Sequence, residues 1–169
     1  MSSGRFEMMR TDEGKILIEV ASRAEASNIL SSSHTCSDVT CLVSIGEAHN
    51  ELPEGYDNVA HKLRLVFADT IAPENGPTEN DVRRIIELAE TLCSTSGRVL
   101  IHCEAGVSRS SAAALIMYAY WLGPGRELEA IEKVLAQRPV AKPNRRMVEL
   151  ADTMLDRGGQ LIEAMELAY

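Results

Sequence analysis

The chain has 169 residues, of which 45% are hydrophobic, and its formal net charge is −8. This length fits one domain, and the acidic balance argues against a nucleic-acid binder or a membrane-surface protein, since both need broad basic patches. The sequence contains neither an apolar run near the roughly 18 residues that span a bilayer nor a hydrophobic N-terminal signal, so we expect a cytoplasmic protein that is not inserted in a membrane.

Strands and helices are predicted to alternate through the middle of the chain, and helices to dominate its end. In chain order the predicted elements are two strands within 5–20 around a turn at Gly14, a helix over 22–32, a strand over 39–45, a loop over 46–60, a strand over 62–68, a loop over 72–78, a helix over 79–95, a strand over 98–102, and helices over 109–122, 126–137, 144–157 and 160–168.

Local signals support several of these elements. Ser22 and Glu25 have the spacing of a capping box, which marks the start of a helix. The continuous apolar run over 39–45 is typical of a strand buried on both faces. Gly97 is expected to end the helix that starts at residue 79. The pattern predicts an α/β fold with a mostly parallel central sheet of about four to five strands, flanked by helices on both faces. We expect a single domain over 1–169, with 158–169 as a helical tail.

The stretch "VLIHCEAGVSRSS", Val99 to Ser111, carries the strongest chemical signal. In an open parallel sheet, ligands bind beyond the carboxyl ends of the strands, which is where the strand over 98–102 delivers Cys103. Small residues let the following loop turn tightly, and a loop of backbone N–H groups that enters a helix N-terminus binds anions. Arg109 adds a planar guanidinium that can hold two phosphate oxygens. A positive environment of this kind favours the thiolate form of a cysteine, so the stretch predicts a phosphate site with a nucleophile.

The segment "HCEAGVSRSS" resembles the signature loop of the cysteine-dependent protein tyrosine phosphatases, and its ending is most similar to the dual-specificity branch. We call residues 103–109 the signature loop. The segments "ILIEVASRAEA", "VTCLVSIGE", "LVFADT" and "AQRPVAKPN" are also similar to parts of that family, so the resemblance covers most of residues 16–157.

The resemblance implies a role for each of five residues. Cys103 would attack phosphorus and form a phosphocysteine, while Arg109 would hold the phosphoryl oxygens. Asp69 would protonate the leaving oxygen and then activate water, Ser110 would donate a hydrogen bond to the departing thiolate, and His102 would support the loop. Glu74 and Asp81 are rival acids, although a carboxylate at Asp81 also suits the first turn of a helix.

The remaining candidates would bind phosphate or support the loop. The predicted phosphate-binding residues are Glu104, Ala105, Gly106, Val107, Ser108 and Arg109. Asn144 would steady the loop from behind. No His/Cys cluster has the spacing of a zinc site, and the resemblance implies neither a metal nor another cofactor.

A phosphorylated protein is the expected substrate, with phosphotyrosine and phosphoserine or phosphothreonine both open. The family also includes enzymes that act on phosphoinositides and on RNA 5′ ends; Glu104 and the absence of lysine from the loop disfavour the lipid, and the negative charge disfavours RNA. Two further alternatives are a catalytically inactive phosphate-binding module and a rhodanese-like sulfur transferase, which the Arg-Ser ending disfavours.

Other residues allow more than one interpretation. Arg138, Lys142, Arg145 and Arg146 form either a solvated helix start or a basic rim beside the site. Cys41 and Cys93 are expected to be buried small residues with free thiols, and a protective disulfide from either one to Cys103 is an alternative. Leu161, Met165 and Tyr169 have the spacing of a helix face that packs on the core.

Overall fold

The central sheet has four strands, all parallel. The structure, a computed structural model, describes residues 16–169. The strands are β1 (Ile16–Ala21), β2 (Val39–Gly46), β3 (Lys62–Val66) and β4 (Gly97–His102), in the spatial order β1-β4-β2-β3. The parallel sheet is therefore confirmed. The strand predicted before Gly14 lies outside the described residues.

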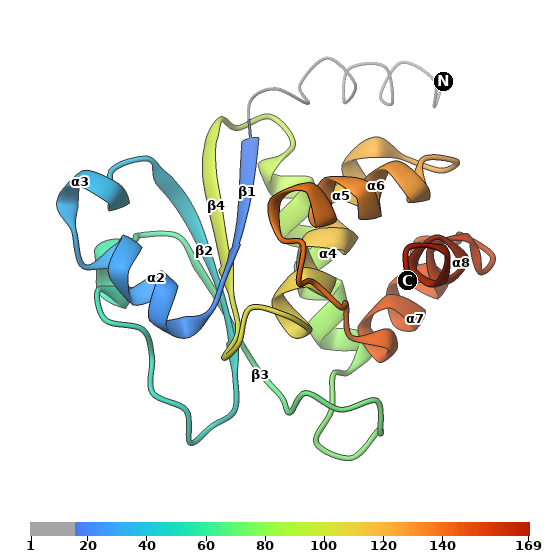
Figure 1. The fold of residues 1–169 in the computed structure, drawn as a ribbon, viewed down its shortest axis with the longest axis horizontal. Coiled ribbons are helices and arrows are strands. Elements are labelled where there is room, and N and C mark those ends of the chain that lie inside the picture. The colour runs from blue at the N-terminus through green and yellow to red at the C-terminus, as the bar shows by residue number, and fades with distance from the viewer. Residues whose placement is uncertain (1–15) are drawn as a thin grey trace.

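Helices cover both faces of this sheet, as predicted. They are α2 (Arg23–Leu30), α3 (Ser33–Cys36), the 3₁₀ turn η1 (Tyr56–Asn58), α4 (Glu79–Leu92), α5 (Arg109–Leu122), α6 (Glu127–Gln137), α7 (Arg145–Met154) and α8 (Gln160–Leu167). Figure 1 shows α2 and α3 on one side of the sheet and α4 to α8 on the other. No helix within residues 16–169 is both long enough and apolar enough to cross a bilayer.

Helix α5 is the centre of the larger core, which lies between the sheet and the helices α4 to α8. Every residue from Ala112 to Met117 has no exposed surface, because α4, α6, α7 and the sheet all pack around this helix. A helix that is apolar on all sides is stable only in such a position. The loop between β4 and α5 therefore starts and ends on buried residues, His102 and Arg109, which hold it in place.

Several predicted boundaries need correction. The capping box at Ser22 is present with both of its hydrogen bonds, but α2 ends at Leu30 rather than at residue 32. The short helix α3, in a stretch rich in serine and other polar residues, was not predicted. Helix α4 ends at Leu92, so Gly97 does not end it; Gly97 begins β4 with a φ of 120°. Helix α7 ends at Met154, before the predicted boundary at 157.

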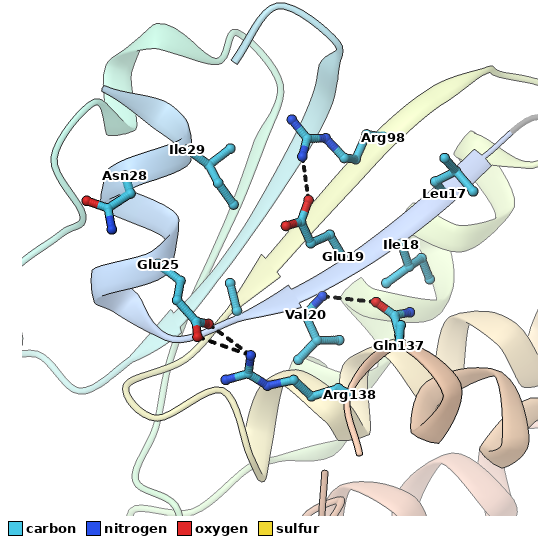
Figure 2. A pocket seen from close by; sticks show the side chains of 11 residues that line it. Leu17, Ile18, Glu19, Val20, Glu25, Asn28, Ile29, Arg98, Gln137 and Arg138 are labelled. Carbon is cyan, nitrogen blue, oxygen red and sulfur yellow. Dashed lines mark hydrogen bonds and ion pairs between the residues drawn. The ribbon is translucent and has the colours of Figure 1, made fainter. Parts of the chain in front are cut away.

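Strand β1 is an edge of the sheet, and side chains occupy its outer amides. Gln137 accepts a hydrogen bond from the N–H of Val20 at 3.2 Å, as Figure 2 shows, and its Nε2 donates to the hydroxyl of Tyr118 at 3.2 Å. Unpaired edge strands recruit other strands, and side-chain partners of this kind block such pairing. These contacts also tie β1 to α5 and α6.

Candidate active site

The signature loop lies at the carboxyl edge of the sheet, directly after β4. Cys103 is 3% exposed, and its Sγ lies 3.0 Å from the Oγ of Ser110 in the first turn of α5. The loop turns at Gly106, which has a φ of 69°. The predicted nucleophile and the predicted hydrogen-bond donor are therefore in direct contact.

All the carbonyl groups of residues 103–108 accept hydrogen bonds from other groups of the protein. Their donors are the His102 ring for Cys103, the Arg23 amide for Glu104, the Arg138 guanidinium for Ala105 and Gly106, and the amides of Lys142 and Asn144 for Val107 and Ser108. In a trans peptide the N–H points away from the preceding C=O. Carbonyls held outward therefore turn the following amides to the inner side of the loop. Within residues 16–169, the amides of residues 104–108 have no protein acceptor, so they can bind an anion.

Arg109 is the cation closest in sequence to this row of amides, and it is 5% exposed. One Nη donates to the carbonyl of Phe67 at 2.8 Å, which fixes the guanidinium against the end of β3. Its Nε is buried and has no partner among the described residues. A buried unpaired donor costs free energy, so the arrangement is suited to an anion that accepts from Arg109.

Asp69 lies in the loop after β3, and its side chain contacts the signature loop. Its Oδ1 accepts hydrogen bonds from the Ser108 hydroxyl at 2.7 Å and from the Asn144 amide at 2.9 Å. Of the two rival acids, Asp81 is the N3 residue of the α4 capping box, where its carboxylate accepts from the N–H of the N-cap residue Thr78. Glu74 has no hydrogen bond or ion pair to the signature loop in the described structure. Asp69 is therefore the candidate acid whose carboxylate contacts the signature loop.

Asn144 joins three parts of the site and is 5% exposed. Its side-chain Oδ1 caps α7 by accepting from the backbone N–H of Met147 at 3.1 Å. Its backbone N–H donates to the carbonyl of Ser108 at 3.1 Å. Its Nδ2 donates to Asp69 and, at 3.2 Å, to the carbonyl of Thr70. Through its backbone N–H and its side chain together, this one residue fixes the position of the Asp69 loop relative to the signature loop.

His102 belongs to a row of polar side chains that sequence reasoning missed. The strand register pairs His102 with Ser44 of β2, and Ser44 with Arg64 of β3. Ser44 Oγ lies 2.6 Å from His102 Nε2 and accepts from Arg64 at 2.9 Å. Burial, together with the nearby charge of Arg64, lowers the pKa of His102. The only signal in the sequence was Arg64 itself, a charged residue between Leu63 and Leu65 in β3.

The basic residues predicted as a solvated helix start or a basic rim mostly have partners inside the protein. Arg138 binds two signature-loop carbonyls and forms an ion pair with Glu25 at 3.0 Å (Figure 2). Arg145 pairs with two glutamates, and Arg146 donates to a backbone carbonyl. Three of the four cations therefore fasten α6 and α7 to their surroundings.

The other predicted residues lie away from the chemistry. All four cysteines are free, and the strand register pairs Cys41 with Val99, four positions before Cys103, so the alternative of a disulfide between them is not realised. Burial raises the pKa of Cys41 to about 11. Leu161 and Met165 pack in the core as predicted, whereas Tyr169 is 59% exposed. No group of side chains within 16–169 has the makeup of a metal site.

Replacing Gly106 by alanine should distort the signature loop. A Cβ at this position would lie 2.6 Å from backbone atoms of Ala21 and Ser22, and the left-handed φ adds strain for any side chain. We expect the free energy of unfolding to fall by about 1–3 kcal/mol, and inorganic phosphate to lose its ability to raise the melting temperature. Urea unfolding and thermal melts with and without phosphate measure both effects.

Gly158→Ala is the matched control, because Gly158 also has a positive φ, of 60°, but has open space where its Cβ would lie. Equal losses of stability in the two variants, with phosphate stabilisation retained in both, would contradict the close approach at Gly106.

Comparisons with known proteins agree with this geometry. The chain matches no protein-family profile. It is 30% identical over 106 residues to the rat protein named Dual specificity protein phosphatase 15, and 34% identical over 108 residues to the human protein of that name. Each match covers 63% of this chain, but only 42% of the rat protein and 33% of the human one. The chain therefore spans less than half the length of these relatives.

Solved structures share the fold. The active form of Tk-PTP superposes with a TM-score of 0.62 at 22% identity, covering 86% of this chain and 94% of that one. Human DUSP28 gives a TM-score of 0.61 at 22% identity, with 82% and 91% covered. PTPMT1 in complex with PI(5)P gives 0.57 at 18% identity, with 84% and 88% covered. At these identities the likeness establishes the fold, which is the one predicted from the sequence.

Proposed function

We propose that this chain, which belongs to the cysteine-dependent protein tyrosine phosphatase superfamily and is similar to its dual-specificity members, hydrolyses phosphate monoesters with Cys103 as the nucleophile. The observation that carries the proposal is the signature loop: its carbonyls are held outward, and its inward amides lie between the thiol of Cys103 and a buried guanidinium with an unpaired Nε. An oxyanion with three equatorial oxygens fits such a set of donors.

In the first step the thiolate of Cys103 attacks phosphorus, and the bond between phosphorus and the ester oxygen breaks. Arg109 and the loop amides hold the phosphoryl oxygens while the charge on them is redistributed. Asp69 gives its proton to the leaving oxygen, which departs as an alcohol or phenol. Both hydrogen bonds from Ser108 and Asn144 end on Oδ1 of Asp69, so the other carboxyl oxygen, Oδ2, is the one that carries this proton.

In the second step water attacks the phosphocysteine, and Asp69, now a carboxylate, accepts a proton from that water. The bond between sulfur and phosphorus breaks, and the electron pair returns to sulfur. The Ser110 hydroxyl, 3.0 Å from Sγ, donates a hydrogen bond to the thiolate as it forms. The products are inorganic phosphate and the starting enzyme, so the cycle needs neither a metal nor a redox partner. A cytoplasmic location fits the reduced thiol that this cycle uses.

A phosphorylated protein is the substrate class that the proposal favours. Glu104 stands in the signature loop, where it pairs with Arg23 at 3.0 Å, and a carboxylate there repels a headgroup that carries several phosphates. The phosphoinositide alternative draws support from the PTPMT1 structure, which was solved with PI(5)P. The inactive binding module remains the alternative outside the enzymes.

Turnover of p-nitrophenyl phosphate by the purified chain tests the proposal, followed by a panel of phosphotyrosyl and phosphoseryl peptides and phosphoinositide vesicles. We expect hydrolysis of the aryl ester and a higher kcat/KM for peptides than for lipids. Saturable phosphate binding without turnover would instead identify a binding module, and preferential turnover of the vesicles would identify a lipid phosphatase. A thiosulfate assay detects sulfur transfer.

A further inference from the structure

We propose that Arg64 is a positioning residue that acts through Ser44 to fix the protonation pattern of the His102 ring, and thereby holds the signature loop in the form that favours the Cys103 thiolate. The three side chains come from adjacent strands, and the register places them in one row across β3, β2 and β4. The importance of this row for catalysis rests on the proposed function. The protonation pattern of His102 rests only on the hydrogen bonds among the three side chains.

The direction of each hydrogen bond in the row follows from Arg64, because its guanidinium can only donate. Ser44 Oγ must therefore accept from Arg64 across the 2.9 Å contact. The Ser44 hydroxyl proton is then available for the ring nitrogen 2.6 Å away, which is His102 Nε2. Since Ser44 has no exposed surface, leaving that proton unpaired would be costly. Ser44 therefore donates, and Nε2 carries no proton.

The other ring nitrogen is fixed by a second group that cannot reverse. His102 Nδ1 lies 3.0 Å from the carbonyl oxygen of Cys103, which only accepts, so Nδ1 carries the proton. The ring is neutral with a single defined tautomer. Burial of His102 to 2% exposure and the positive charge of Arg64 both keep the pKa of the ring low. Without Arg64 the Ser44 hydroxyl could rotate and instead accept a hydrogen bond from a protonated Nε2.

The tautomer matters because its Nδ1–H is what holds the Cys103 carbonyl outward. A carbonyl oxygen turned toward the sulfur would place a negative dipole end beside the thiolate and destabilise it. The charged and titratable groups in this region are Arg64 from β3, Arg23 from α2, Tyr56 from η1, Glu104 and Arg109 from the signature loop, and Asp69 from the loop after β3. Among these, Arg64 is the group that hydrogen bonds to Ser44, which in turn contacts the His102 ring.

Nitrogen-15 NMR of the histidine-labelled protein provides the first test. The ring signals of His102, assigned with His102→Gln, should show a proton on Nδ1 and none on Nε2 near neutral pH. In Arg64→Met the ring should gain its second proton at a higher pH than in the unmodified chain, because a nearby positive charge has gone. A wild-type ring protonated on Nε2 would overturn the proposal whether or not any variant folds.

The second test is the rate at which iodoacetamide alkylates Cys103, read by mass spectrometry of the peptide that contains it. At a fixed pH at which the His102 ring is neutral, we expect Cys103 to react about threefold to tenfold more slowly in Arg64→Met and in Ser44→Ala. Arg64→Lys retains a donor and should recover most of the rate. Alkylation needs no phosphatase turnover, so this result stands apart from the proposed function.

Lys62→Met is the matched control, because Lys62 lies two residues earlier on β3 and its loss changes the charge equally. Lys62 pairs with Asp57 and lies 4.9 Å from the centre of the Tyr56 ring, away from Ser44. We expect wild-type rates from it. If Arg64→Met alkylates as fast as Lys62→Met, with the His102 signals unchanged, the proposed role of Arg64 is wrong.

Discussion

Cys103→Ser is expected to abolish phosphatase turnover, with kcat falling by at least about 10⁴-fold, because a serine hydroxyl in this site has no adjacent base to ionise it. Binding of inorganic phosphate should remain, since the loop amides and Arg109 make the contacts to the oxygens and all of them are still present. Stopped assays with p-nitrophenyl phosphate give the rate, and isothermal titration with phosphate gives the affinity.

Cys93→Ser serves as the control for this result, because Cys93 is a half-buried free cysteine at the end of α4 and takes no part in the site. It should hydrolyse the ester at the wild-type rate. Residual turnover of more than a few per cent in Cys103→Ser, or activity lost equally in both variants, would remove Cys103 from the role of nucleophile.

Asp69→Asn is expected to lower kcat by about 10²–10⁴-fold on substrates with poor leaving groups, because an amide has no proton to give to the departing oxygen. The loss should be smaller for p-nitrophenyl phosphate, whose leaving group departs readily without a proton. The decline of kcat on the alkaline side should disappear, since that side of the profile reports the loss of the general acid's proton. Rates measured against pH for one aryl and one alkyl ester test this directly.

Asp81→Asn provides the comparison, because it changes the carboxylate that completes the capping box of α4 with Thr78 and does not hydrogen bond to the signature loop. It should cost at most about 1 kcal/mol of stability and leave the pH profile of kcat unaltered. A profile for Asp69→Asn that keeps its alkaline decline, with equal losses on aryl and alkyl esters, would assign the general acid elsewhere.

The signature loop and its flanking elements could be predicted because their signals are local. Helix α5 spans Arg109–Leu122, the predicted range, since an apolar run begins at the loop and ends at a glycine. The role of Cys103 beyond β4 follows from the rule for parallel sheets. The proximity of Asp69 came from the family resemblance, and the structure supports it with two hydrogen bonds.

The cross-strand contacts could not be predicted, because a single sequence does not show how strands align. Ser44 and Arg64 matter only through a register that places them beside His102, and residues 20 or more positions apart give no periodic signal. Arg138 was misinterpreted for the same reason: its partners are carbonyls on a loop more than thirty residues away. Boundaries such as the end of α4 were wrong because hydrogen-bonded turns after Leu92 replace the predicted helical residues.

The outward carbonyls of the signature loop also link catalysis to cooperative unfolding. Apart from the His102 ring, their donors come from the start of α2, the end of α6 and the segment that leads into α7, which are separate parts of the chain. Partial detachment of any one of these segments would release a carbonyl and allow a peptide plane to flip. Heat inactivation should therefore coincide with the global transition, and a shortened chain that lacks α6 and α7 should be unable to hold an anion even where its sheet survives.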